Sequence, residues 1–529
     1  MLAKILIFFT FAVAINSKHY SINTNLQVQE IPEDLIEVLK QDKQIVATSR
    51  FIDDRTKSGW TYLTIQTNPD HADWLQTYST GYLEGFLTYE LIWAAYKNLK
   101  LFYDIDFDNP PQNTTEFIKQ QALWALVNII GRKGDPYFEL LNATTAQAFG
   151  VHEGYLAAVK QNNRTDMILD YMTFYFLTYI VDYYDVYEKY MGKDVHQPRC
   201  SFLMKLTDDS LFTSHTTWSK YSNLLRVYKV FDFNLRNSLV KTKRISFTSY
   251  PGSLSSLDDY YVLDGSRVVT ETSLSTENSD VYQDVHPDSV PSWMRVTIAN
   301  WIASDQESWA DAFFSYRSGT GNNQWLMIDY KNYELYKKNL SKAKNIVWII
   351  EEFFSLTSSQ DVTQLLVNQG YLASYNVPYD PKILELSKSS TNYTNDPRYH
   401  LFKKYAPGIK HMDDMKNVMR LNNVSDTGDF CDAIASRCDL DKTEEYPWGA
   451  TDCKITSDKM VAQHQNWIIS GPTTKNLPPF TWSDWPRFAK NISEIPKIFN
   501  FNWVYVDPKT NFTGLDSDSF DEKFHSIIW

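Results

Sequence analysis

A single cysteine lies where the chain could be cut to leave a reactive terminus. Cys200 follows the polar, proline-containing segment 194–199 and begins an apolar run that predicts a β-strand. A polar segment of this kind is a natural site for chain cleavage. Scission between Arg199 and Cys200 would set the thiol beside a free α-amine, whose pKa of about 7.7–8 suits a general base. Nucleophile and base would then belong to one residue. The alternative is that Cys200 is a small buried hydrophobe.

The other three cysteines cluster near the C-terminal end. Cys431, Cys438 and Cys453 lie within 23 positions. In an oxidising compartment we expect one disulfide among them and one remaining thiol, with the pairing left open. Their spacing matches no common zinc pattern and no nearby histidine pair completes one, so no metal site is expected.

Several familiar catalytic motifs are absent from the sequence. None of the 18 glycines begins a Gly-x-Ser-x-Gly elbow, a Gly-x-x-x-x-Gly-Lys phosphate loop or a Gly-x-Gly-x-x-Gly turn, and there is no His-Glu-x-x-His pair. We therefore expect no cofactor. Paired carboxylates carry no information in a chain with 64 acidic residues.

The composition is that of a globular chain with an aromatic excess. The 529 residues carry a formal net charge of −13, which argues against a nucleic-acid partner because phosphate binding requires a basic surface. Aromatic residues make up 15% of the chain, enough for large buried aromatic layers or for a surface that faces lipid or sugar.

The first residues predict a secretory signal peptide. Lys4 precedes the apolar run 5–15, and the small and polar residues Asn16 and Ser17 follow it, so we assign residues 1–17 to the signal. No stretch reaches the roughly 20 apolar residues that span a bilayer. The expected location is outside the cell or in the lumen of a lysosome or vacuole.

Eight N-glycosylation sequons agree with this route, and we expect them on surface loops. They are Asn113, Asn142, Asn163, Asn339, Asn392, Asn423, Asn491 and Asn511.

Hydrophobic periodicity predicts an α+β layered fold in which helical and strand-rich stretches follow one another. Helices are expected over residues 74–103, 115–130, 166–190 and 293–316. Strands are expected over 200–206, 211–218, 244–250, 260–263, 267–272, 324–330 and 345–350. Asp264-Gly265 predicts a two-residue hairpin turn. The tail from residue 431 to 529 is expected to be loop-rich.

Blocks of sequence on both sides of Cys200 resemble the phospholipase B-like family. The most specific are Cys200-Ser-Phe-Leu-Met-Lys-Leu206, His215-Thr-Thr-Trp218 and Ser318-Gly-Thr-Gly-Asn-Asn-Gln-Trp325. Further blocks follow the family order: Gly59–Leu63, Gly81–Gly85, Ser249–Gly252, Asp258–Tyr261, Glu271–Ser273, Ala303–Asp305, Ser308–Asp311, Ile328–Lys331, Ala373–Pro378, Arg437–Leu440 and Ser470–Pro472. The resemblance covers nearly the whole chain after the signal.

The resemblance implies an N-terminal nucleophile hydrolase with a four-layer αββα sandwich and a loop-rich C-terminal decoration. Proteins of this class are made as precursors and cut immediately before the nucleophile. Carried over to this chain, the cut separates a helical N-terminal fragment, residues 18–199, from a catalytic fragment, residues 200–529. Both fragments would belong to one fold.

The resemblance also assigns roles to residues in the matching blocks. Cys200 would be the thiolate nucleophile, its α-amine the proton shuttle, and His215 a hydrogen-bonding neighbour. Asn322 or Asn323 would supply the oxyanion hole, with a slight preference for Asn323.

Other residues in family-like blocks are supporting candidates. These are Trp218, Thr272 and Arg437, although core packing is the simpler interpretation of Trp218. Thr216 departs from the family, which more often has Asn or Asp after the histidine, so any role of that side chain is open.

The implied activity is removal of fatty acyl chains from glycerophospholipids through a thioester on Cys200. Two alternatives stay open. One is an N-acyl amide hydrolase, because N-terminal nucleophile machinery more commonly cuts amides, and the other is a catalytically inactive lipid-binding member. The implied partner is a phospholipid or another acyl lipid, with transient contact at a membrane surface and no nucleic acid.

Overall fold

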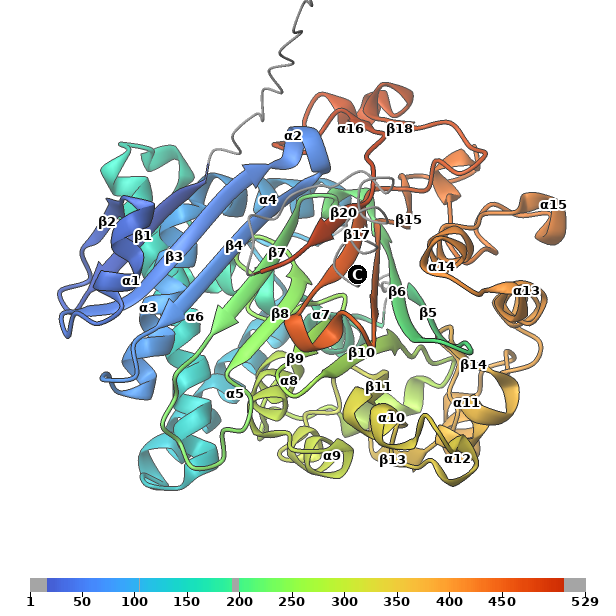
Figure 1. The fold of residues 1–529 in the computed structure, drawn as a ribbon. Helices are drawn as coiled ribbons and strands as arrows, with labels where there is room; N and C mark the ends of the chain where they lie inside the picture. Colours follow the sequence, from blue (N-terminus) through green and yellow to red (C-terminus); the bar gives the residue numbers. More distant parts are fainter. Residues whose placement is uncertain (1–16, 104, 193–198, 509–529) are drawn as a thin grey trace, which may run out of the picture.

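The computed structural model describes residues 17–508 apart from residue 104 and residues 193–198. Residues 1–16 of the expected signal peptide and the sequon at Asn511 lie outside the described residues. The described chain mixes helices with two large sheets and one small sheet, so the predicted α+β class is confirmed (Figure 1).

The larger sheet has eleven strands and contains most of the predicted strands. In spatial order they are β13 (Leu356–Asp361), β12 (Val347–Phe353), β11 (Asn323–Asp329), β10 (Arg267–Ser273), β9 (Tyr260–Leu263), β8 (Arg244–Ser249), β7 (Arg226–Asp232), β4 (Trp60–Thr67), β3 (Ile45–Asp54), β1 (Lys18–Asn23) and β2 (Val28–Ile31). Neighbours are antiparallel except β4 and β7, which run parallel. This parallel pair joins the segment before residue 199 to the segment after it in one sheet.

The smaller sheet contains the strand on which Cys200 lies. Its order is β14 (Tyr371–Ser374), β5 (Arg199–Leu206), β6 (Leu211–Lys220), β16 (Asp452–Ser457), β17 (Asn466–Ser470) and β20 (Val504–Val506), and β15 (Trp448–Ala450) also pairs with β6. β5 and β6 form the hairpin that the sequence predicts, with Leu206 opposite Leu211. A separate pair joins β18 (Phe480–Thr481) to β19 (Ile498–Phe499).

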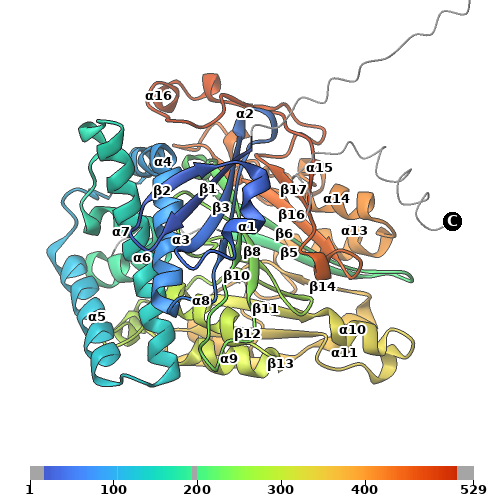
Figure 2. The ribbon, with the colours of Figure 1, turned by 60° about the vertical axis from the view of Figure 1, so that its left-hand side comes forward.

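Helices from two stretches of the chain pack on one face of the larger sheet (Figures 1 and 2). They are α3 (Asp73–Leu87), α4 (Tyr89–Phe102), α5 (Gln112–Gly131), α6 (Pro136–Gln161), α7 (Tyr171–Met191), α8 (Ser292–Ile302) and α9 (Gln306–Phe314). Sheet residues such as Leu63 and Trp325 share one buried cluster with Tyr155 and Phe174 of the helices. Much of the aromatic excess lies in this layer, where burial of each ring removes a large apolar area from water.

The other face of the larger sheet packs against the smaller sheet. Phe202 of β5 shares a buried cluster with Val262 of β9 and Leu326 of β11. The outer face of the smaller sheet packs on α13 (Pro397–Tyr405) and α14 (Met412–Met419). The remaining short helices are α1 (Ile36–Leu39), α2 (Arg55–Ser58), α10 (Tyr330–Tyr336), α11 (Thr363–Gln369), α12 (Pro381–Ser387), α15 (Val424–Thr427) and α16 (Pro486–Ala489).

Glycines allow α3 and α6 to touch backbone to backbone. A Cβ on Gly85 would lie 1.9 Å from the Val151 carbonyl oxygen, and one on Gly154 would lie 2.1 Å from the Tyr82 carbonyl oxygen. Both distances are far below van der Waals contact, so a larger residue would force the helices apart. The small residues that permit this contact also weaken the apolar periodicity of α6, which explains why the sequence did not predict that helix.

Two predicted helices are each divided in the structure. Residues 74–103 form α3 and α4, separated at Thr88, whose backbone leaves the helical region and whose hydroxyl donates to the Glu84 carbonyl at 2.7 Å. Residues 293–316 form α8 and α9, because Asp305 caps α9 anew by accepting from the Ser308 N–H.

Strand content was underestimated at both ends of the chain. β1 to β4 precede the helices, so the N-terminal segment is not purely helical as predicted. The tail after residue 431 contributes β15 to β20 and has more strand than the loop-rich prediction allowed.

Candidate active site

Cys200 is the second residue of β5 and is buried inside the protein. Only 1% of the surface of this residue is exposed. Cys200 lies directly opposite Thr217 of β6 in the antiparallel register, so both side chains point to the same face of the smaller sheet. The preceding residue, Arg199, begins the strand and is exposed. The peptide bond between Arg199 and Cys200 therefore lies at the start of β5, where the chain passes from the surface into the interior.

Cys200, His215 and Glu271 form a tight cluster from three strands. One ligand-type atom of each, the Cys200 Sγ, a ring nitrogen of His215 and a carboxylate oxygen of Glu271, lies within 4.8 Å of the other two. His215 donates from Nε2 to the Glu271 carbonyl oxygen at 2.9 Å. Its Nδ1 has no hydrogen-bond partner among the described residues, although the side chain is fully buried. The sequence predicted the first two members and missed Glu271.

Burial holds this cluster in its uncharged forms. It raises the pKa of the Cys200 thiol well above its ordinary value, and a charge on Glu271 would add to that shift. Burial likewise raises the pKa of Glu271 and lowers that of His215 well below its ordinary value. The neutral imidazole that results has one N–H donor, at Nε2, and one basic nitrogen, at Nδ1. In the uncut chain, then, the thiol is protonated and a free base lies in its cluster.

The main chain of Cys200 is held by two residues that sequence reasoning missed. The Cys200 N–H donates to Asn376 Oδ1 at 3.1 Å, and the Cys200 carbonyl accepts from Arg398 Nη1 at 2.7 Å. Arg398 Nη1 also donates to Asn376 Oδ1 at 2.9 Å. Asn376 belongs to the family-like block 373–378, which was the available signal for it. If the chain is cut before Cys200, Asn376 Oδ1 becomes an acceptor for the new α-amine.

The two neighbouring asparagines have different surroundings. Asn322 uses both ends of its amide: Oδ1 accepts from the Phe354 N–H at 2.5 Å, and Nδ2 donates to the Gly319 carbonyl at 3.1 Å. The Asn323 side-chain amide is oriented so that its nitrogen faces two acceptor oxygens. It donates to the Asn322 carbonyl at 2.7 Å and to Glu271 Oε2 at 3.1 Å. Asn322 also donates to Asp185 Oδ2 of α7 at 3.3 Å and is therefore held by partners outside the cluster, whereas the Asn323 amide contacts Glu271 in the cluster.

A buried ion network adjoins Cys200 through Thr217. The Thr217 hydroxyl donates to Asp258 Oδ2 at 3.0 Å and accepts from Lys454 Nζ at 2.7 Å. Arg226 pairs with Asp258 and, at 2.6 Å, with Asp452. Lys454 pairs with the same two carboxylates at 3.1 and 2.9 Å. Two cations and two anions thus balance among buried residues, and the network links β6 and β16 of the smaller sheet to β7 of the larger sheet.

The supporting candidates lie in the core, at different distances from the chemistry. Thr272 Oγ1 hydrogen-bonds Ser374 Oγ at 2.5 Å and accepts from the Asn376 N–H at 3.4 Å, so it positions the segment that contacts Cys200. Trp218 donates from Nε1 to the Ile434 carbonyl at 3.1 Å, and its ring lies 4.6 Å from the Arg398 guanidinium. Thr216 donates to the Met419 carbonyl at 3.2 Å.

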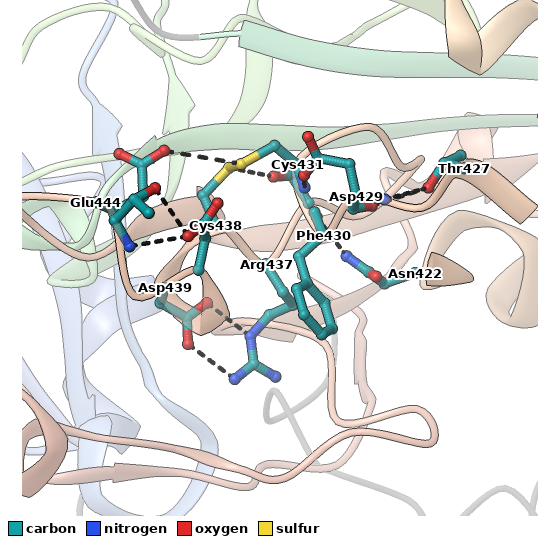
Figure 3. Close-up of a disulfide and its surroundings, with 12 residues drawn as sticks. Asn422, Thr427, Asp429, Phe430, Cys431, Arg437, Cys438, Asp439 and Glu444 are labelled. Carbon is teal, nitrogen blue, oxygen red and sulfur yellow. Dashed lines mark hydrogen bonds and ion pairs between the residues drawn. A yellow bond between two sulfur atoms is a disulfide. The ribbon is translucent and has the colours of Figure 1, made fainter. Parts of the chain in front are cut away.

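The clustered cysteines form one disulfide, between Cys431 and Cys438 (Figure 3). Cys453 remains a buried free thiol, as does Cys200. Arg437 lies in the same loop, with its guanidinium directed at Asp439 through two contacts of 2.8 and 2.9 Å. It also donates to the carbonyls of Thr473 and Pro478. Arg437 therefore stabilises the C-terminal loops.

The sequons in the described chain are mostly accessible. Five are exposed, namely Asn113, Asn163, Asn339, Asn392 and Asn491. Asn423 is half-buried and donates to the Tyr405 hydroxyl at 2.9 Å. Asn142 lies within α6 and is half-buried, and Asn113 lies in the first turn of α5, so the expectation of a surface loop is wrong at both positions.

Asp259 gives the region a pH-dependent contribution to stability. Burial and the neighbouring Asp258 raise its pKa to about 7. Between about pH 4 and 7 the folded chain keeps a proton that the unfolded chain has released, so the free energy of unfolding falls as pH rises through this window. This fall in the free energy of unfolding amounts to about 3 kcal/mol between pH 4 and pH 7, and we expect Asp259→Asn to remove it.

The thermal unfolding midpoint at pH 4.5 and at pH 7 measures this effect. The difference between the two midpoints should shrink in Asp259→Asn and stay as in the wild type in the exposed control Asp311→Asn. Equal shrinkage in both variants would contradict the assignment to Asp259.

Comparison with known proteins identifies the family. The family model described as Phospholipase B matches residues 47–506. The chain belongs to the phospholipase B family. It is 32% identical over 510 residues to Phospholipase B-like protein B of Dictyostelium discoideum, covering 90% of this chain and 86% of the relative. It is 30% identical to Phospholipase B-like 1 of Rattus norvegicus, with 88% of each chain covered, and 30% identical to Phospholipase B of Crotalus adamanteus, with 88% of this chain and 89% of the relative covered.

The phospholipase B match extends from β3 to β20 and crosses residue 199. It therefore includes the parallel pair β4 and β7 and both strands of the Cys200 hairpin. Within the described ranges, no helix of this phospholipase B family member combines the length and the apolar character needed to cross a bilayer.

Proposed function

We propose that this phospholipase B family member is an acyl hydrolase of glycerophospholipids, activated by cleavage between Arg199 and Cys200. The observation that carries the proposal is the buried cluster of Cys200, His215 and Glu271, whose reactive atoms lie within 4.8 Å at the start of a strand. Asn376 provides an acceptor for the α-amine that the cut would create. The names of the relatives supply the substrate class, a phospholipid.

The fold we propose is the four-layer αββα sandwich of the N-terminal nucleophile hydrolases. Its support is the packing order: helices α3 to α9, the larger sheet, the smaller sheet, then α13 and α14. Residues 18–199 and 200–529 would be two chains of this one fold, because β4 and β7 pair across the cut. The predicted signal peptide and the sequons favour synthesis for secretion or for a lysosomal or vacuolar lumen.

The cleavage step cannot use the Cys200 α-amine, because this amine is formed only by the cut. It uses the Cys200 thiol and the His215 imidazole, which are present in the intact chain. The Cys200 sulfur adds to the Arg199 carbonyl carbon, the carbon–nitrogen bond breaks, and the acyl group moves to sulfur. The thiol proton passes to the departing Cys200 nitrogen, with the basic Nδ1 of His215 as the carrier. Water then hydrolyses the thioester, which leaves a carboxylate on Arg199 and restores the Cys200 thiol beside a free amine.

The same centre then acts on lipid. The α-amine accepts the thiol proton as sulfur attacks the ester carbonyl, and it returns this proton to the departing alkoxide. Water attacks the resulting thioester, and the fatty acid leaves. The Asn323 amide is our candidate donor to the oxyanion that forms in both steps, because it reaches Glu271 in the cluster and the N–H that donates to Glu271 Oε2 would turn to the oxyanion.

Asn323→Ala tests the oxyanion assignment. Loss of one oxyanion donor typically lowers kcat by about 10²–10³-fold, and we expect a fall of that size with little change in KM. Asn332→Ala on α10 is the control, because this asparagine donates to the Asn345 carbonyl and not to a residue of the cluster. A kcat for Asn323→Ala equal to that of the control would reject the assignment.

Matched ester and amide lipids test the reaction itself. Purified, cleaved protein is incubated with a phospholipid ester and with an N-acyl amide of the same acyl chain, and released fatty acid is measured. Preferred release from the ester supports the proposal, and preferred release from the amide selects the N-acyl amide hydrolase. No release from either, with the chain cleaved, selects an inactive lipid-binding protein.

We also propose that α5 makes transient contact with a lipid surface. Leu123, Leu126, Val127 and Ile130 follow helical spacing along its outer side and are 60%, 51%, 58% and 69% exposed. Lys119 and Lys133, both exposed, flank this stripe in a chain of net charge −13. An apolar stripe with basic ends suits an anionic bilayer surface.

Vesicle sedimentation tests this contact. The double substitution Leu126→Glu and Ile130→Glu should weaken binding to phosphatidylserine-containing vesicles by at least about tenfold, because each apolar side chain that enters the bilayer contributes roughly 1.5–3 kcal/mol. Leu335→Glu on α10, a position that is 72% exposed, is the matched control. Equal binding of both variants would exclude α5 as the contact.

A further inference from the structure

A cavity next to the proposed catalytic cluster has a largely apolar lining. It lies between α4, α7 and the segments around β7, and its volume is about 50 Å³. Apolar side chains line it from several elements, namely Ala95, Leu99, Leu177, Ile180, Leu225 and Leu257. The volume exceeds the roughly 10–15 Å³ that a single water molecule requires and is smaller than the ~150 Å³ cavity that admits a benzene ring.

This cavity adjoins a smaller one that lies at the proposed catalytic cluster. A second cavity of about 20 Å³ is lined by Glu271 and Asn323, and it shares Val181, Tyr184 and Leu257 with the larger one. The larger cavity is also lined by Thr217, the cross-strand partner of Cys200. The smaller cavity thus lies at Glu271 and Asn323, and the larger one lies on the other side of the three shared residues.

The polar groups that line the larger cavity have partners within the protein, except the Ser222 hydroxyl, which has none among the described residues. The Tyr184 hydroxyl donates to the Tyr103 hydroxyl at 2.8 Å, and the Tyr250 hydroxyl accepts from Arg226 at 2.7 Å. Asn223 donates to Ser219 at 2.8 Å. A ligand in this space would therefore meet few unsatisfied hydrogen-bonding groups. An apolar chain fits such a lining, whereas a head group with charged or hydroxyl substituents would lose its hydration without compensation.

We infer that the larger cavity holds the acyl chain of the substrate next to its carbonyl carbon and selects short acyl groups over long ones. The inference rests on the proposed function, because it needs Cys200 as the nucleophile and Asn323 beside the carbonyl oxygen. A carbonyl at Glu271 and Asn323 would direct its acyl carbons past Leu257 toward α4 and α7. A long chain would have to displace Leu177 and Ile180, both of which are more than nine-tenths buried.

Acyl-length profiles test this inference. The substrates are phosphatidylcholines that differ only in acyl length, from acetyl to palmitoyl. We expect kcat/KM of the wild type to fall with length, and Ala95→Leu, which fills the cavity from α4, to lower the ratio of butanoyl to acetyl hydrolysis by about tenfold or more. Ile180→Val, a mild enlargement, should shift the profile toward longer chains. Ala122→Leu on the exposed side of α5 is the control for an alanine-to-leucine change on a helix.

Fatty-acid binding provides a readout that does not depend on catalysis. Butanoate is titrated calorimetrically into Cys200→Ala, alone and combined with Ala95→Leu or with Ala122→Leu. Weaker butanoate binding only in the Ala95→Leu combination supports the cavity as the acyl-binding site. If this result is obtained while no ester is hydrolysed, the proposed function fails and the binding site stands. Length profiles and butanoate affinities that are the same in Ala95→Leu and Ala122→Leu overturn the inference and leave the proposed function intact.

Discussion

Cys200→Ala is expected to remain a single uncut chain and to release no fatty acid. The substitution removes the sulfur that attacks both the Arg199 carbonyl and the lipid ester, so both reactions stop at their first step. The wild type should yield two fragments, the second of which begins at Cys200. N-terminal sequencing and gel electrophoresis measure the cut, and fatty-acid release from phospholipid measures hydrolysis. Loss of activity should reach the detection limit, because no other group in the cluster can carry the acyl intermediate.

Cys453→Ala is the matched control for this experiment. Cys453 is also a buried free thiol in the smaller sheet, and burial also raises its pKa, to about 12. Its replacement should leave the cut and the hydrolysis intact. An uncut wild-type chain that still hydrolyses lipid, or a Cys200→Ala variant that is cut normally, would refute the mechanism.

Asp258→Ala is expected to lower the free energy of unfolding by about 3–5 kcal/mol. Asp258 is 1% exposed and pairs with Arg226 and Lys454. Although burial alone would raise its pKa, these two cations hold it well below its usual range. Removing the carboxylate leaves two buried cations opposed by Asp452 alone, and water cannot reach them to compensate.

Urea-induced unfolding measures this loss. Asp280→Ala is the control, because Asp280 forms an exposed pair with Lys388 at 3.5 Å, and such pairs contribute about 0–1 kcal/mol. Similar losses in the two variants would mean that the buried network does not stabilise the fold as argued. The Asp258→Ala loss should also be larger at pH 7 than at pH 3, where the Asp258 carboxyl of the unfolded chain is largely protonated and the folded network's advantage has begun to disappear.

Local sequence patterns predicted the elements near Cys200 well. The apolar run after Cys200, the polar turn at 207–210 and the next apolar run gave the hairpin of β5 and β6. The Asp264-Gly265 turn gave the hairpin of β9 and β10, but the predicted two-residue loop is wrong: Leu263 pairs with Arg267, so residues 264–266 form a three-residue loop. Each signal resides in a few adjacent residues, so neighbours along the chain suffice to specify it. The same approach failed for α6, where small residues replace the apolar stripe, and for β1 to β4.

The candidate site was only partly predictable. Cys200, His215 and the asparagine pair stand out by residue type and by their family-like blocks. Asn376 and Arg398 contact Cys200 from 176 and 198 residues along the chain. Asn376 lies in a family-like block, but nothing in that block indicates the contact with Cys200, and Arg398 has no such signal. Glu271 looks like an ordinary strand glutamate until the sheets pack and bury it.

The sequence by itself determined which residues are chemically able to act. It placed a cysteine at the start of a strand and a histidine on the next strand. It also placed three cysteines close enough together for two of them to form a disulfide. Tertiary structure alone decided which sulfurs join, which asparagine faces the thiol, and which groups stay uncharged. The physical reason is that strand and turn formation depend on adjacent residues. Ionisation and hydrogen bonding instead depend on burial and on partners that distant segments supply only after they pack.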